Sequence, residues 1–172
     1  TGTGGVLNFD NVTGGSASDT LTGNANVNVL HGGPGNDTLT GGPGGDQLFG
    51  DADNDTIIWN NGDGSDFIEG GDGNDLVVVN GSPAGGDQFL LQVNPADPTR
   101  LRFDRTNLGL FNLNIGSTEA LEFNTLDGND TATIEFAGGN PIPVNGLKYT
   151  GGAGSDRLVL QRSANTYVAT SM

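Results

Sequence analysis

One nine-residue pattern recurs from Gly14 to Val78 and restricts how this chain can fold more than any other feature. Each unit contains a glycine-rich stretch, then Asp or Asn at its sixth position, then a large aliphatic residue at its eighth. Short repeats in a constant register are typical of solenoids, in which each unit packs against its neighbours instead of around a central core. The units are GGSASDTLT from Gly14, GNANVNVLH from Gly23, GGPGNDTLT from Gly32, GGPGGDQLF from Gly41, GDADNDTII from Gly50, NGDGSDFIE from Asn61 and GGDGNDLVV from Gly70.

The two constant positions predict a turn that ends in a carboxylate and a short strand with one buried residue. Side chains alternate across a strand, so we expect the eighth-position residue to point inward and to build a narrow apolar spine. The eighth-position residues are Leu21, Leu30, Leu39, Leu48, Ile57, Ile68 and Val77. The sixth-position residues are Asp19, Asn28, Asp37, Asp46, Asp55, Asp66 and Asp75.

The glycine-rich part of each unit predicts a metal site. Glycine at the first, second and fourth positions allows positive φ, which would direct carbonyl oxygens into the space between stacked turns. Calcium takes six to eight oxygen ligands from carboxylates and carbonyls, so one turn would supply part of a shell and the next turn the rest. The expected ligands are the six sixth-position aspartates together with Gly33, Gly35, Gly42, Gly44, Gly71 and Gly73.

These units resemble the repeats-in-toxin (RTX) family, whose motif is G-G-x-G-x-D-x-U-x, with U a large apolar residue. The resemblance implies a calcium-binding, right-handed parallel β-roll in which two units make one coil and alternate units stack on opposite sides. One side would then carry Asp19, Asp37, Asp55 and Asp75, and the other Asn28, Asp46 and Asp66.

Three departures from the motif affect the expectation. Asn28 lacks the charge of the other sixth-position residues, which weakens its site. The inserted Trp59 and Asn60 are expected to bulge the turn before Asp66. GVLNFDNVT from Gly5 is a degenerate unit that keeps Asp10 and Val12.

The charge distribution independently indicates bound cations. The chain has 6 Lys and Arg against 21 Asp and Glu, a net charge of −15, and residues 1–99 contain fourteen carboxylates and no Lys or Arg. On strands roughly 5 Å apart these carboxylates would repel one another, and about four to six calcium ions would offset about 8 to 12 charges. A solvated acidic surface or a disordered acidic tail is the alternative, but disorder would not preserve the aliphatic register.

Beyond Val79 the chain has fewer glycines and all of the basic residues. Alternating segments predict strands at 89–93, 100–104, 111–115, 120–124, 131–136, 147–149 and 157–161. The turns DGND and GGAGSD end at Asp130 and Asp156, which we also expect to bind calcium. Their separation of 26 residues predicts one wider coil with three strands. We therefore expect a calcium-binding roll at 1–78 and a wider parallel solenoid at 79–172, with a separate small β-sandwich as the alternative.

The sequence contains no recognisable catalytic constellation, so we expect a protein that is not an enzyme. His31 is the only histidine, there is no cysteine, and neither His-Glu-x-x-His nor G-x-S-x-G occurs. The acidic repeats have the wrong charge for nucleic acid, and no apolar run reaches the roughly 20 residues of a membrane span. The chain begins at Thr1, from which we expect a mature or excised piece.

Two functions fit these expectations. The first is a secreted structural or adhesive module on a bacterial surface or in its matrix, which associates head to tail with further copies into filaments. The alternative is the non-catalytic, calcium-dependent folding and secretion domain of a larger secreted enzyme or toxin. An ice-binding face is a weaker third possibility, because Thr20, Thr38 and Thr56 recur every 18 residues but Gln47 and Phe67 stand at this position in intervening repeats.

Overall fold

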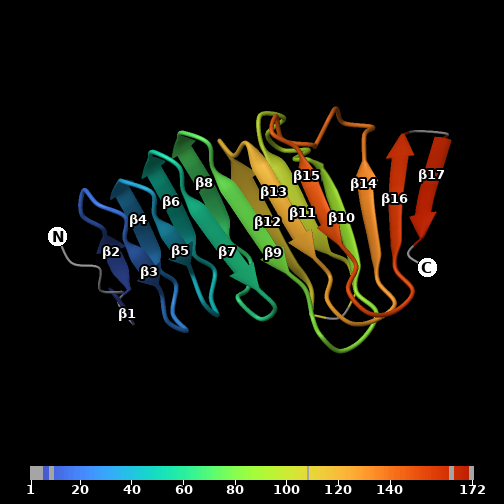
Figure 1. Ribbon diagram of the computed structural model, residues 1–172, viewed down its shortest axis with the longest axis horizontal. Helices are drawn as coiled ribbons and strands as arrows, with labels where there is room; N and C mark the ends of the chain where they lie inside the picture. The colour runs from blue at the N-terminus through green and yellow to red at the C-terminus, as the bar shows by residue number, and fades with distance from the viewer. Residues whose placement is uncertain (1–5, 8–9, 108, 163–164, 171–172) are drawn as a thin grey trace.

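The protein, described by a computed structural model, is an all-β solenoid of two sheets that lie face to face (Figure 1). The structure describes residues 6–7, 10–107, 109–162 and 165–170, and side chains only within 10–107 and 109–162. These residues form no helix, and so none that could span a membrane. In Figure 1 the strands follow one another along the long axis, from the N-terminus at one end to the C-terminus at the other.

The first sheet, sheet A, is parallel throughout and the second, sheet B, is mostly parallel. Sheet A has seven strands, in spatial order β1 (Val6–Leu7), β3 (Thr20–Thr22), β5 (Thr38–Thr40), β7 (Thr56–Asn60), β9 (Leu76–Asn80), β13 (Ala120–Asn124) and β15 (Leu147–Thr150). Sheet B has ten, in spatial order β17 (Asn165–Thr170), β16 (Arg157–Arg162), β14 (Thr131–Glu135), β10 (Gln88–Val93), β11 (Leu101–Arg105), β12 (Phe111–Gly116), β8 (Phe67–Asp72), β6 (Gln47–Ala52), β4 (Val29–Pro34) and β2 (Asn11–Thr13).

Alternate repeats supply alternate sheets, which confirms the predicted β-roll. Strands of sheet A pair at a spacing of one coil, so that Leu21 lies beside Leu39 and Leu39 beside Ile57. Sheet B does the same with Leu30 and Leu48. The seven eighth-position residues are at most 1% exposed and form the apolar spine between the sheets. The spine exists because every coil presents one aliphatic side chain from each sheet at the same height.

The insertion of Trp59 and Asn60 has a different effect from the predicted bulge. The two residues lengthen β7, and Trp59 enters the core, where it is 1% exposed and stacks on Phe111 with ring centroids 3.9 Å apart. The indole Nε1 donates a hydrogen bond to the carbonyl oxygen of Gly64. The inserted residues therefore mark the point where the narrow spine widens into an aromatic core.

The seven predicted strands beyond Val79 are confirmed, but their directions are not all parallel. β10, β11 and β12 form an antiparallel meander, with β12 parallel to β8 and β10 parallel to β14. This meander adds strands to sheet B that have no counterpart in sheet A. Its inner face buries Phe89, Phe103 and Phe111, whose rings contact one another. Phe89 and Phe103 also contact Phe123 of β13.

The coil from Asp130 to Asp156 contains two strands where three were predicted. These strands are β14 and β15, and the remaining length forms an irregular segment at 136–146. The segment places Ile142 and Phe136 against the core. The segment thus covers part of the core without forming a third strand.

The threonine row differs from the sequence interpretation as well. Gln47 and Phe67 lie in sheet B, so they do not interrupt Thr20, Thr38 and Thr56, which are direct neighbours in sheet A. The row nevertheless ends after these three strands, because the next partner of Thr56 is Leu76.

Candidate metal centres

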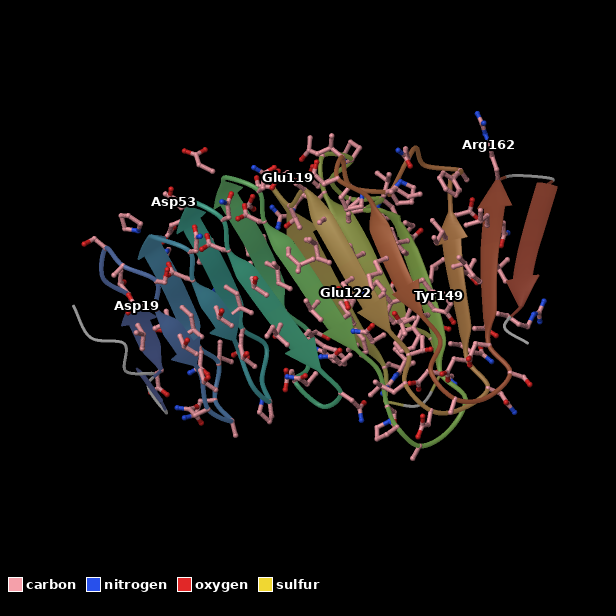
Figure 2. All side chains as sticks on the ribbon, viewed as in Figure 1. Asp19, Asp53, Glu119, Glu122, Tyr149 and Arg162 are labelled. Atoms are coloured by element: carbon pink, nitrogen blue, oxygen red, sulfur yellow. The ribbon has the colours of Figure 1, made fainter. Side chains whose placement is uncertain are left out.

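The sixth-position aspartates form two hydrogen-bonded columns, one along each long edge of the roll. Along each column, the backbone N–H of one residue donates a hydrogen bond to a carboxyl oxygen of the corresponding residue one coil later. We call the two sets column A and column B, after the sheet whose strands they precede. Column A runs from Asp19 to Asp37, Asp55 and Asp75 at 2.7 to 2.8 Å, and ends with Glu119 Oε2, 2.8 Å from the N–H of Asp75. Figure 2 labels Asp19 and Glu119, the first and last residues of column A.

Column B has the same bonding in two separate stretches. In the first stretch, the N–H of Asn28 donates to Asp46 Oδ1 and the N–H of Asp46 donates to Asp66 Oδ1, both at 2.8 Å. The second stretch joins the N–H of Asp87 to Asp130 at 2.7 Å and that of Asp130 to Asp156 at 3.1 Å. The structure therefore brings all eight predicted aspartates into the two columns, which Asp87 and Glu119 complete.

The second carboxyl oxygen of most of these residues is buried without a hydrogen-bond partner. An ionised carboxylate oxygen is costly to bury unless a donor or a cation faces it. Six of the unpartnered atoms are Oδ2 atoms and the seventh is Oδ1 of Asp87. The residues are Asp37, Asp46, Asp55, Asp66, Asp75, Asp87 and Asp130. A divalent cation beside these oxygens would supply the missing charge, so the donor set fits calcium.

Backbone oxygens converge on the same places. A Cβ built on Gly81 would lie 2.9 Å from the carbonyl oxygen of Thr125 and 3.1 Å from Asp87 Oδ2. The first-position glycines of the nonapeptides show the same arrangement: a Cβ on Gly32 would collide with Asp37 Oδ2 and the carbonyl oxygen of Gly50. The missing side chain therefore lets a carboxyl oxygen and a backbone carbonyl oxygen of the next coil, two of the ligand types that calcium takes, lie close together.

The second and fourth positions require glycine for a different reason, namely positive φ. Five of the predicted glycines have it, and a carbonyl carbon or oxygen of the preceding coil lies close to each missing side chain. Their φ values are 94° at Gly33, 125° at Gly35, 84° at Gly42, 113° at Gly71 and 147° at Gly73.

Gly44, Asp51 and Asp53 are among the residues that depart from the expected glycine pattern. Gly44 does not have positive φ, although a Cβ there would lie 2.8 Å from the carbonyl oxygen of Asn26. Asp51 and Asp53 occupy second and fourth positions with φ of 77° and 78°. The turn geometry is thus maintained where its glycines are absent, at the cost of a left-handed conformation that L-residues adopt rarely.

Burial and mutual repulsion raise the pKa values of several carboxyl groups in the columns. Burial raises the pKa of Asp55 to about 6, and repulsion from Asp75 and Asp37 adds to the effect. Burial, with the charges of Asp46 and Asp63, raises the pKa of Asp66 to about 7. The remaining raised carboxyl pKa values have burial as their largest cause and belong to Asp37, Asp46, Asp63, Asp75 and Asp130. Proteins keep such groups ionised by pairing them with cations.

Asn28 and Asp10 show how the column B stack begins without a full charge. Asn28 is fully buried, and its Nδ2 donates to the carbonyl oxygen of Asp10. The exposed Asp10 accepts hydrogen bonds from the side chains of Asn24 and Asn26, which lower its pKa. An amide can therefore hold the turn together where the charge of an aspartate is missing.

Sequence reasoning missed Asp87 and Glu119. One extra residue, Gly86, moves Asp87 to the seventh place of a unit that begins at Gly81. Glu119 comes from the short connection between β12 and β13 and has no motif around it. The signal that could have identified Asp87 is the run from Gly85, GGDQF, which repeats the order of glycine, Asp and buried apolar residue with Phe89 in the buried place.

Among the described residues, no three His, Cys, Asp or Glu side chains gather around one point. A calcium shell here would combine carboxylates with backbone carbonyls.

The family model for the RTX calcium-binding nonapeptide repeat (4 copies) matches residues 5–39, 22–57 and 61–81. No curated protein matches the chain. Repeats of this family are non-catalytic and bind calcium ions. Residues 5–57 and 61–81 of this chain thus match the RTX calcium-binding nonapeptide repeat, and the described residues among them fold as a β-roll.

Proposed function

We propose that the chain is a secreted structural or adhesive module whose β-roll is completed by calcium bound along columns A and B. The unpartnered buried carboxyl oxygens support this proposal most directly. The proposed ligands are the column aspartates, including Asp130 and Asp156 beyond the matched repeats, and carbonyl oxygens of the stacked turns. Calcium concentrations of about 10⁻⁴ to 10⁻³ M, typical for extracellular modules, would then switch the acidic part of the chain from unfolded to folded.

Circular dichroism of the metal-free chain, followed by calcium titration, tests the folding role. We expect little β-structure in the acidic repeats without metal, and a cooperative gain when calcium is added. Magnesium at equal ionic strength is the control for screening, since it demands a smaller octahedral shell. A complete β-spectrum in EDTA that calcium does not change would contradict the proposal.

Head-to-tail association is the second part of the proposal. In the described residues, sheet A ends at β1 and β15, and open strand edges can pair with another copy. Arg157 and Arg162 are exposed on β16, and Figure 2 shows Arg162 projecting from that end. The first 99 residues carry a charge of −14, so these arginines could contact acidic turns of the next copy. Such a contact does not close on itself and produces fibres.

Electron microscopy in millimolar calcium tests the association. We expect filaments, and the double variant Arg157→Glu/Arg162→Glu should shorten them while leaving calcium-induced folding intact. Single particles that remain monodisperse at high concentration would contradict association. They would favour the alternative, in which the chain is the non-catalytic folding and secretion domain of a larger secreted enzyme or toxin.

A further inference from the structure

The hydrogen-bond ladder of column B is divided at one step, between the turn of Asp66 and the turn of Asp87. The antiparallel meander of β10, β11 and β12 separates these two turns in sheet B, because β11 and β12 lie between β8 and β10. β11 runs opposite to its neighbours, so its C-terminal residue, Arg105, reaches the edge at which the parallel strands begin. The meander thereby places a guanidinium group at the edge of the roll that carries the column B carboxylates.

Arg105 contacts the turns on both sides of this step. Its Nη2 donates a hydrogen bond over 2.8 Å to the side-chain oxygen of Asn61, the first residue of the turn that ends in Asp66. The same atom lies 3.2 Å from Asp87 Oδ2. Elsewhere in the column, successive turns are joined by carboxylate oxygens, and their charge requires a cation. At this step the cation is part of the chain.

The surroundings of Arg105 suit a guanidinium group. Its side chain is 6% exposed and that of Asp87 is not exposed at all. The guanidinium carbon lies 5.6 Å from the ring centroids of both Phe89 and Phe111. A planar guanidinium group fits such a site, because it packs against aromatic rings and still donates hydrogen bonds to oxygen atoms at its edge.

We propose that Arg105 takes the place of a calcium ion at this step of column B. Its guanidinium group neutralises Asp87 and joins the turn at 61–66 to the turn at 81–87 without metal. Column B then consists of two calcium-binding stretches separated by a metal-independent link, while column A continues from Asp75 to Glu119. This inference rests on the proposed calcium function.

A charge-neutralising pair of variants tests the link, with unfolding followed through Trp59, which stacks on the same Phe111. At the lowest calcium concentration that keeps the unmodified chain folded, Arg105→Gln should raise the ratio of unfolded to folded protein by about 100-fold. The variant leaves the buried charge of Asp87 without a cation, although its Oδ2 still accepts a hydrogen bond from the N–H of Ser82. Adding Asp87→Asn to this variant should recover most of the loss. Arg102→Gln is the matched control, since Arg102 lies on the same strand with its side chain 44% exposed. It should change the ratio only a few-fold.

Calcium dependence separates this role from simple packing. If Arg105 replaces an ion, a large excess of calcium should reduce the loss in Arg105→Gln by at least tenfold, because an ion can then enter beside Asp87. A loss that is equal at limiting and excess calcium, or a double variant no more stable than the single one, would overturn the proposal. If calcium had no effect on the unmodified chain, the calcium function itself would fail, and the Arg105–Asp87 cycle could still be measured.

Discussion

Protons should substitute for calcium in the metal-free chain. Asp55 and Asp66 are 1% and 3% exposed, and their folded-state pKa values are about 6 and about 7, against 3.8 for an ordinary Asp. The folded chain therefore holds protons that the unfolded chain has already released. Stability that depends on these protons is fully present below pH 3.8 and is lost as the pH rises through about 6 and 7.

The size of the effect follows from these two pKa values. Between pH 5 and its folded pKa each carboxyl group changes the stability by about 1.4 kcal/mol per pH unit. Raising the pH from 5 to 8 thus crosses about one unit for Asp55 and about two for Asp66, which together cost roughly 4 kcal/mol. Since domains are commonly stable by about 5 to 15 kcal/mol, this loss is large enough to decide whether the repeats fold without metal.

Circular dichroism in metal-free buffer between pH 8 and pH 5 measures this effect. We expect β-structure to increase as the pH falls, and the double variant Asp55→Asn/Asp66→Asn to reduce that dependence. His31→Gln is a control, because His31 is the only histidine of the chain and its Nδ1 lies 3.1 Å from Asp51 Oδ2. In excess calcium the pH dependence should reverse, with more β-structure at pH 8 than at pH 5, since protons then compete with bound ions. Metal-free β-structure that stays constant or rises towards pH 8 would refute the reasoning.

Two further predictions concern single positions in the repeats. Asp55 is bonded to both Asp37 and Asp75, so Asp55→Ala should reduce the number of bound calcium ions more than Asp19→Ala, which lies near the start of column A. Equal calcium stoichiometry in calorimetric titration would contradict the stacking order. Gly32→Ala should destabilise the calcium-loaded fold by about 1 to 3 kcal/mol, because its Cβ would collide with backbone of the next coil. Gly45→Ala is its control, since that Cβ would meet its nearest atom at an ordinary 3.4 Å. Equal denaturation midpoints for the two alanine variants would show that the close approach at Gly32 is unimportant.

The repeats were predictable because two constraints act at fixed positions in every unit. The inward aliphatic residue and the carboxylate each recur with the strand period, so one register satisfies both. Trp59 illustrates where this reasoning fails: an insertion can add a residue to a loop or to a strand, and the sequence does not distinguish them. Here the strand gained the residues because the indole ring could be buried against Phe111, which is distant in sequence.

The meander was not predictable from alternation alone. A half-buried strand shows the same alternation whether its neighbour is parallel or antiparallel. The alternation at 100–104 and 111–115 therefore did not indicate in which direction these strands run relative to their neighbours. The short connection after Arg105 was the available signal, because a parallel neighbour needs a connection of a dozen or more residues. The burial of Arg105 beside Asp87 follows from strand direction, and it therefore could not be inferred before the direction was known.

The direct pairing of Leu21 with Leu39 and of Leu30 with Leu48 has a consequence for how such a chain can vary in length. Removing or duplicating two consecutive nonapeptides in this part shifts every later residue by one whole coil and leaves each side chain facing the same way. Each duplication would extend the roll by about 4.8 Å, the distance between neighbouring strands. The meander cannot be lengthened by whole coils in this way, because β10 and β12 each pair with one parallel and one antiparallel strand. Evolution could therefore adjust the length of the acidic end in whole coils, while the aromatic end stayed constant.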